Sequence, residues 1–141
     1  MKMMTIHDLE INQRAEHTKK ITQEEVYAFS EITGDRNPIH MDKEYAERTF
    51  FKKQIAHGAL LSGLISAVFG MKVPGPGAIY EMQELRFLKP VYFGDEVTAY
   101  VEVQEINKER NRVTFNTGCS NQKGEIVAEG RSVLLPSKNN H

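Results

Sequence analysis

The stretch from Gly58 to Gly70 constrains the fold more than any other part of this sequence. Its apolar residues cover nearly every side of a helix instead of keeping to one stripe: Ala59, Leu60, Leu61, Leu64, Ile65, Ala67, Val68 and Phe69. A helix that is apolar all round is a buried helix. The turn-rich run Pro74-Gly75-Pro76-Gly77 ends it. The rest of the chain must therefore supply the walls of a core around this helix.

The C-terminal half supplies those walls, because its residues alternate with the two-residue period of β-strands. One face of the first run carries Val97, Ala99, Val101 and Val103. A second run carries Val113, Phe115, Thr117 and Cys119, and a third alternates between residues 126 and 134. Turn signals at residues 93–95, 108–111 and 121–124 separate the runs. The pattern predicts about four long antiparallel strands.

The N-terminal third is interpreted as an edge strand followed by helices. Residues 13–21 are polar and compatible with a strand. The run Thr22-Gln23-Glu24-Glu25 is a capping-box pattern and predicts a helix start, and Gly34 can end that helix. Residues 35–40 are predicted to be a loop, because Pro38 lacks an amide hydrogen and disfavours helical geometry in the residue before it. Asp42 can cap a short helix that runs through Arg48.

Length and composition point to one domain spanning residues 1–141, with Pro136–His141 as a polar tail that is expected to fray. The net charge of −1, without long blocks of one sign, indicates no nucleic-acid partner. The single cysteine, Cys119, excludes a disulfide framework, and no spacing of ligand residues suggests a metal. No secretory signal or membrane span is visible, so we expect a soluble cytoplasmic protein.

The most specific motif lies between Phe29 and Ala46. It reads Phe29-Ser30-Glu31-Ile32-Thr33-Gly34-Asp35-Arg36-Asn37-Pro38-Ile39-His40, then five residues, then Ala46. This segment resembles the signature of the MaoC-like, (R)-specific enoyl-CoA hydratase family, also called hydratase 2, without a mismatch. Ile55-Ala56-His57-Gly58 and residues 86–97 also look like family segments. The resemblance therefore extends over most of the chain.

The resemblance implies a fold and an activity. The fold would be an α+β hot-dog domain, in which a curved antiparallel sheet wraps around a central hydrophobic helix. The activity would be that of a hydro-lyase, the reversible hydration of trans-2-enoyl-CoA to (R)-3-hydroxyacyl-CoA. No cofactor would be needed beyond the CoA that the substrate carries. The family forms homodimers or larger assemblies of dimers, and pairing of sheets would also remove an exposed sheet edge.

The residues themselves support such chemistry. Hydration requires a group that deprotonates the attacking water, a proton for C2 and stabilisation of charge on the thioester oxygen. Asp35 and His40 lie five residues apart on a loop stiffened by Gly34 and Pro38, so both could contact one water. The amide of Gly58, at a helix start, is the candidate oxyanion donor. We favour Asp35 as the base and His40 as the group that positions the water and shares transfer to C2.

Further roles rest on the resemblance. The position of Asn37 implies an orienting residue in the same site. Ser66 and Phe69 lie three residues apart on the helix face that lines the acyl pocket in the family, and the bulk of Phe69 predicts a preference for short acyl chains. His57 is expected to pack or hydrogen-bond at the helix entrance and not to act as a second base. Exposed basic residues such as Arg36 are expected to be solvated.

Three alternatives remain open at this point. A 3-hydroxyacyl-ACP dehydratase would use the same residue pair on an acyl-carrier-protein substrate. A thioesterase with this fold would need a carboxylate on the central helix, and residues 58–70 contain none. A non-catalytic acyl-CoA-binding module would be expected to lack an intact Asp–His pair, which this chain retains.

Overall fold

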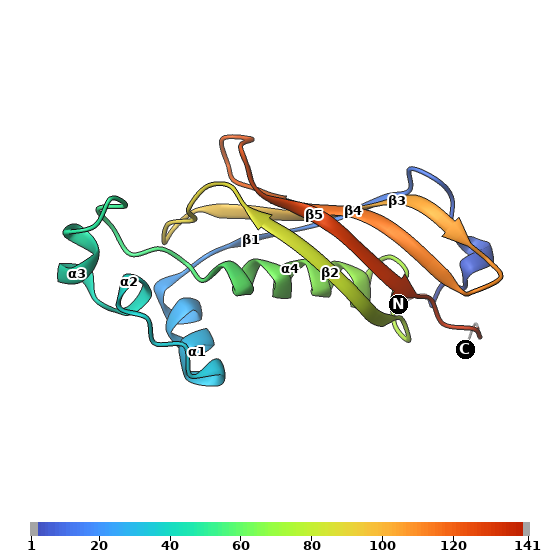
Figure 1. Ribbon diagram of the computed structural model, residues 1–141, viewed down its shortest axis with the longest axis horizontal. Coiled ribbons are helices and arrows are strands. Elements are labelled where there is room, and N and C mark those ends of the chain that lie inside the picture. The colour runs from blue at the N-terminus through green and yellow to red at the C-terminus, as the bar shows by residue number, and fades with distance from the viewer. Residues whose placement is uncertain (1–2, 140–141) are drawn as a thin grey trace.

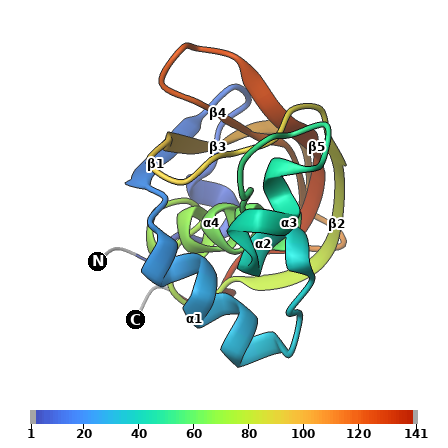
Figure 2. The same ribbon diagram turned by 90° about the vertical axis from the view of Figure 1, so that its left-hand side faces the viewer.

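The computed structural model describes residues 3–139, and its centre is a curved sheet wrapped around one long helix (Figure 1). The sheet is antiparallel, with strand order β1-β3-β4-β5-β2. The helix is α4 (Gly58–Met71), and the strands are β1 (Arg14–Lys20), β2 (Ile79–Phe87), β3 (Glu96–Asn107), β4 (Arg112–Ser120) and β5 (Ile126–Leu135). Viewed along α4, the sheet curves around the helix (Figure 2). This arrangement confirms the expected hot-dog class and the four long strands.

The core lies between α4 and the concave face of the sheet. One side of α4 is buried, through Leu61, Leu64, Ile65, Val68 and Phe69. The inward residues of β3, at positions 97, 99, 101 and 103, are fully buried against it. Val113, Phe115, Thr117 and Cys119 of β4 are also buried. Burial raises the pKa of the Cys119 thiol to about 12, so this thiol stays protonated and packs as a small apolar group.

The other side of α4 is open in the single chain, which the sequence pattern did not predict. Ala59, Gly63, Ser66 and Met71 on that side are exposed. Three of the four are small, so the exposed surface is smooth and weakly polar. A chain that buried α4 on all sides would need a second layer, and the one sheet here covers only one side.

The helix that precedes the candidate site is capped as expected. In α1 (Gln23–Thr33), the hydroxyl of Thr22 accepts a hydrogen bond from the amide of Glu25 at 3.2 Å, and the Glu25 carboxylate accepts from the amide of Thr22 at 3.2 Å. Such a cap typically contributes about 1 kcal/mol. Gly34 ends the helix with φ +83°, a backbone conformation that glycine adopts without strain.

The loop predicted over residues 35–40 is partly wrong, because Pro38–Met41 form a one-turn helix, α2. Proline suits the first turn of a helix, where its missing amide hydrogen would have no intrahelical acceptor. Asn37 caps this turn by accepting from the amide of Ile39 at 3.3 Å. The next helix, α3 (Lys43–Glu47), is capped by Asp42, whose side chain accepts from the amide of Tyr45 at 3.1 Å.

The two ends of the molecule are formed by different parts of the chain. Helices α1 to α3 project beyond the sheet near the N-terminus of α4, whereas both ends of the described chain lie at the opposite end (Figure 1). There, the backbone amide of Met4 donates a hydrogen bond to the carbonyl oxygen of Pro74 at 3.0 Å. A short 3₁₀ helix (Ile6–Asp8) comes next in the chain. The expected frayed tail includes residues 140–141, which lie outside the described residues. No helix within residues 3–139 is both long and apolar enough to cross a membrane.

Candidate active site

The structure brings Asp35 and His40 together at the N-terminus of α4, with His57 beside them. One carboxylate oxygen of Asp35 and one ring nitrogen of each histidine all lie within 4.8 Å of one another. Asp35 is exposed, whereas His40 is 8% and His57 2% exposed. An accessible carboxylate therefore stands next to two largely enclosed imidazoles.

Local hydrogen bonds shape the loop that carries Asp35. Its backbone amide donates to the Thr33 hydroxyl at 3.1 Å, and its Oδ1 accepts from the amide of Asn37 at 3.2 Å. This Asx turn points the carboxylate back over the loop. The side-chain oxygen of Asn37 is itself engaged in capping α2. Asn37 is exposed and lies beside Asp35, and its orienting role stays a prediction.

His40 is fixed in one tautomer. Its Nδ1 lies 2.6 Å from the carbonyl oxygen of Ile55. A carbonyl can only accept, so Nδ1 carries the hydrogen and Nε2 of the neutral ring carries a lone pair. The side-chain amide of Gln54 donates to the His40 carbonyl at 2.8 Å and to the Tyr27 hydroxyl at 3.0 Å. Both the ring and the backbone of His40 are thus held by residues just before α4.

Burial is the main reason why the pKa of His40 lies below its usual value of 6.5. The nearby imidazole of His57 lowers this pKa further, while the hydrogen bond to Ile55 and the charge of Asp35 raise it. Because the lowering effects dominate, the ring is neutral at neutral pH. The neutral form with a free Nε2 can accept a hydrogen bond, or a proton, from a water molecule.

His57 takes part in the site through buried contacts. Its Nε2 lies 2.9 Å from the Ser30 hydroxyl oxygen and 3.1 Å from the backbone carbonyl oxygen of Asp35. Its ring stacks on that of His40, with centroids 3.8 Å apart and an interplanar angle of 26°. It also packs against Phe29, with centroids 4.8 Å apart. The expectation that His57 hydrogen-bonds at the helix entrance is therefore confirmed, and the contact with Asp35 goes beyond it.

An open cavity of about 540 Å³ adjoins His40 and contains the start of α4. Its lining is mostly apolar: His40, Phe51, Ile55, Ala56, Gly58, Ala59, Leu61, Phe87, Leu88, Lys89, Pro90 and Val91. Gly58 is the first residue of α4, and amide hydrogens of the first helical turn have no acceptor within the helix. A Cβ atom at Gly58 would lie only 2.8 Å from the ring of Phe87. Phe87 therefore packs directly against Gly58, and any side chain at this position would collide with its ring.

Ser66 and Phe69 do not line this cavity. Phe69 is 2% exposed and packs edge-on against Phe115 at 4.8 Å and Tyr80 at 5.4 Å, so it belongs to the core. Ser66 lies on the exposed side of α4. The three-residue spacing predicted one shared face for both residues. In the structure, part of that face belongs to the core and part to the open side of the helix, so Phe69 is buried and Ser66 is exposed. Their role in an acyl pocket stays a prediction.

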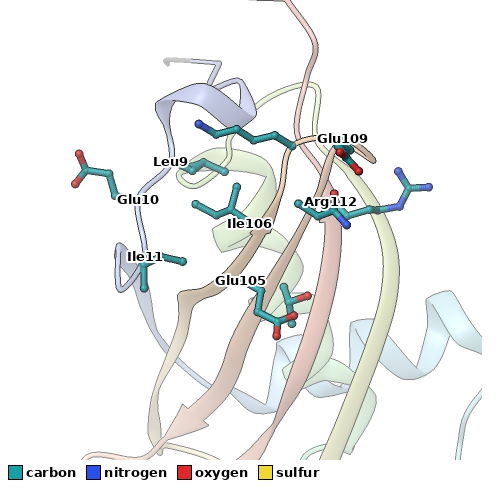
Figure 3. Close-up of a pocket in the computed structure, with 10 residues that line it drawn as sticks. Leu9, Glu10, Ile11, Glu105, Ile106, Glu109 and Arg112 are labelled. Carbon is teal, nitrogen blue, oxygen red and sulfur yellow. The ribbon is translucent and has the colours of Figure 1, made fainter.

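A larger cavity, of about 990 Å³, lies at the other end of the molecule and contains none of the candidate residues. Figure 3 shows Leu9, Ile11 and Ile106 there, with Glu105, Glu109 and Arg112 around them. We assign the candidate site to the smaller cavity, because it adjoins His40 and Gly58, and catalysis requires the acid–base groups to be within reach of the substrate.

Sequence reasoning identified Asp35, His40, Gly58 and the enclosed position of His57, but it missed the contacts that hold these residues. Gln54, Ile55 and His57 hold the Asp35–His40 segment, Ser30 meets His57, and Phe87 covers Gly58. All of these contacts join segments far apart in sequence, which periodicity cannot pair. The one available signal was the position of His57, a polar residue that directly precedes the apolar helix and therefore had to be enclosed.

The cluster of Asp35, His40 and His57 has the residue types of a metal site, so its geometry requires a test. The two imidazole planes are nearly parallel and stacked, so their in-plane lone pairs run side by side and do not converge on one point. Nδ1 of His40 and Nε2 of His57 also face carbonyl oxygens and must carry hydrogens. The arrangement instead suits hydrogen bonding to a water or substrate oxygen.

Comparisons with known proteins identify relatives of this chain. A family model for the MaoC like domain matches residues 7–123. The chain is 44% identical to an (R)-specific enoyl-CoA hydratase from Rhodospirillum rubrum, covering 93% of this chain and 91% of that protein. It is 43% identical to a 3-hydroxybutyryl-CoA dehydratase from Methylorubrum extorquens, covering 98% and 88%. The structure of the unliganded R-hydratase PhaJ1 from Pseudomonas aeruginosa superposes with a TM-score of 0.93, at 39% identity, over 99% of this chain and 90% of that one.

Proposed function

This chain belongs to the MaoC-like domain family, and we propose that it is an (R)-specific enoyl-CoA hydratase. As a hydro-lyase it would interconvert a trans-2-enoyl-CoA and the (R)-3-hydroxyacyl-CoA. The observation that carries the proposal is the convergence of the Asp35 carboxylate and His40 beside a mostly apolar cavity that holds the Gly58 amide. The names of the relatives support the substrate class and the hand of the product.

In the proposed reaction, one water molecule contacts both Asp35 and Nε2 of His40. The Asp35 carboxylate takes a proton as the water oxygen bonds to C3, and electrons of the C2–C3 double bond move toward the thioester oxygen. The proton taken up by Asp35 is then passed to C2, so that H and OH add across the double bond and the carboxylate is regenerated. The neutral His40 ring keeps the water in place and shares the transfer to C2.

The developing charge on the thioester oxygen would be met by the amide of Gly58. Amide groups at a helix N-terminus favour negative charge, because they lack partners and lie at the positive end of the helix dipole. The phenyl ring of Phe87 lies against the same glycine and would limit the access of bulk water. No cofactor is required by these steps, since CoA enters as part of the substrate.

We propose that the protein acts as a homodimer. Strand β2 has one unpaired edge in the single chain, and it carries the exposed apolar residues Ile79 and Phe87. The other free edge, on β1, carries charged residues such as Arg14, Glu16 and Lys19. Strand β2 also carries exposed charged residues, but the large exposed apolar side chains of Ile79 and Phe87 favour pairing with a second copy, and β1 has no large apolar side chain.

The proposal is tested with purified protein and crotonyl-CoA, by following loss of the enoyl-thioester absorbance. The hand of the product is determined with an (R)-specific 3-hydroxyacyl-CoA dehydrogenase. We expect rapid loss with (R) product, and a loss of about 10² to 10⁴-fold in kcat for both Asp35→Asn and His40→Gln. Near-normal rates in either folded variant would contradict the assignment of that residue.

A second outcome separates the alternatives. If the folded wild-type protein leaves crotonyl-CoA untouched, the same assay with crotonyl acyl-carrier protein distinguishes a carrier-protein dehydratase from a non-catalytic binding module. Activity on the carrier-bound substrate alone would replace the CoA proposal with the dehydratase.

A further inference from the structure

We propose that His57 is a positioning residue of this site, which holds the backbone of Asp35 through Nε2–H and supports the His40 ring through its own ring. The inference rests on the proposed function, because it assigns His57 a part in bringing the two reacting groups together. His57 itself is 98% enclosed and does not line the cavity. It would act through its neighbours and not on the substrate.

The contact with Asp35 determines the tautomer of His57. The carbonyl oxygen of Asp35 can only accept, so the nitrogen 3.1 Å from it, Nε2, must carry a hydrogen. The Ser30 hydroxyl can direct its own hydrogen to the sulfur of Met41, 3.0 Å away, and accept from the same Nε2. The neutral ring then has its lone pair on Nδ1. This tautomer is the opposite of that in His40, where Nδ1 carries the hydrogen.

The remaining nitrogen argues against a role in packing alone. Nδ1 of His57 is buried and has no hydrogen-bond partner among the described residues. Leaving a buried polar atom unpaired is unfavourable, and an apolar ring would fill the same space without that cost. What an apolar ring could not provide is the donor on Nε2, the atom that meets both Ser30 and Asp35.

The stacked ring connects the second reacting group to the same support. His40 is held at Nδ1 by Ile55 and at its carbonyl by Gln54, and its ring lies face to face with His57. Residues 54–57 therefore contact both Asp35 and His40, although neither reacting residue is in that segment. Burial, and to a lesser extent the adjacent His57 ring, also keep the pKa of His40 low.

Two substitutions separate the donor from the ring. His57→Phe keeps an aromatic ring for stacking and removes the donor, whereas His57→Gln offers an amide N–H at a similar distance from the backbone and removes the ring. We expect His57→Phe to lower kcat for crotonyl-CoA hydration by about 10- to 100-fold, as small displacements of reacting groups do. KM should change by less than about threefold, because the cavity lining is unaltered. His57→Gln should recover a substantial part of kcat.

The matched control is His17→Gln, which replaces a histidine on strand β1, away from the cavity. It should leave both kinetic constants unchanged. If folded His57→Phe retains wild-type kcat, or if Phe and Gln variants lose kcat equally with a parallel loss of thermal stability, the positioning role is overturned and His57 is a structural residue.

A measurement on the wild-type protein tests the inference without any variant. Nitrogen-15 NMR of the imidazole rings should show Nε2–H for His57 and Nδ1–H for His40. A His57 ring protonated on Nδ1 instead would overturn the donor role, even if the hydratase assay succeeds. Conversely, an inactive wild-type protein with the expected tautomers would contradict the proposed function and leave this geometry intact.

Discussion

At the scale of single residues, the site depends on which nitrogen of each imidazole is already engaged in a hydrogen bond with the protein. His40 offers Nε2 because Ile55 occupies Nδ1, and His57 offers nothing to the cavity because Ser30 and Asp35 occupy Nε2. Two histidines in contact thus have different uses, set by carbonyl groups that no sequence motif specifies. The backbone carbonyl of Ile55 therefore determines that Nε2 is the free nitrogen of His40.

The lowered pKa of His40 leads to a prediction about pH. Burial lowers this pKa in the folded state below 6.5, so between the folded value and about 6.5 the unfolded chain binds the extra proton and the folded chain does not. The contribution of His40 to stability is therefore present above about pH 6.5 and is lost as pH falls through the folded pKa. We expect an NMR titration of the His40 ring to give a midpoint below 6.5. A midpoint above 6.5 would contradict the dominance of burial.

Gly58 provides a second prediction at this scale. In Gly58→Ala, the added methyl group would collide with the Phe87 ring, so the ring or the start of α4 beside the proposed oxyanion donor would have to shift. We expect kcat/KM to fall at least tenfold, as for loss of other oxyanion donors. Adding Phe87→Ala relieves the collision but leaves the methyl group in place. If the double variant regains full activity, the collision is the whole effect and access to the Gly58 amide is irrelevant.

The residues that the sequence could identify were those whose roles are local. Asp35 and His40 lie in one short motif, and Gly58 lies at the visible start of an apolar helix. His57 was visible as a polar residue in an enclosed position, but its partners, Ser30 and Asp35, lie 27 and 22 residues away. Contacts of that kind depend on how α1 is placed against α4, which one sequence does not specify.

At the scale of elements, boundaries followed from capping groups where the chain provided them. Thr22 and Asp42 were recognised as caps and do begin α1 and α3. The turn of α2 was missed because Pro38 was taken as a helix breaker, although proline breaks helix interiors and suits first turns. The open side of α4 was missed for a different reason: apolar composition does not tell whether a helix is covered by its own chain or by another.

The enclosed side of α4 gives the prediction at this scale. Phe69→Ala should lower the free energy of unfolding by about 3–5 kcal/mol, because a buried aromatic ring is lost and a cavity is left beside Phe115. Phe50 is the control, since it is 92% exposed and its replacement by alanine should change stability by less than about 0.5 kcal/mol. Denaturant unfolding measures both.

The same variant tests the acyl-pocket prediction for Phe69. Rates on enoyl-CoA substrates of increasing chain length should extend to longer chains in Phe69→Ala if its ring bounds the pocket. An unchanged profile, together with the loss of stability, would assign Phe69 to the core alone.

At the scale of the whole molecule, the two free edges of the sheet differ in the side chains that they expose. The exposed Ile79 and Phe87 of β2 and the small residues of the open side of α4 remain uncovered in one chain, whereas β1 has no large apolar side chain. The alternation of the strands and the single apolar helix predicted a sheet around a helix, and the resemblance to the MaoC-like family supplied the hot-dog class, because the pattern alone also allows other α+β folds. How copies of the chain associate did not follow from the sequence, because it depends on surfaces formed only after folding.

The β2 edge makes dimerisation testable. Ile79 is 61% exposed on β2, and Ile79→Lys would place a charge on each side of a two-fold interface. We expect light scattering to give twice the chain mass of 16.1 kDa for the wild type and a single chain mass for this variant. Thr18→Lys, on the exposed β1 edge, should remain dimeric. A monomeric Thr18→Lys with a dimeric Ile79→Lys would place the interface on the opposite edge.

The placement of both chain ends at the C-terminal end of α4 has a practical consequence. The helix has 14 residues and, at 1.5 Å per residue, sets about 20 Å between those ends and the loop with Asp35 and His40. Within one chain, a group attached near residue 3 or residue 139 therefore lies at the end opposite Asp35 and His40 (Figure 1). A single chain can be immobilised through that end while the loop with Asp35 and His40 stays accessible from solution.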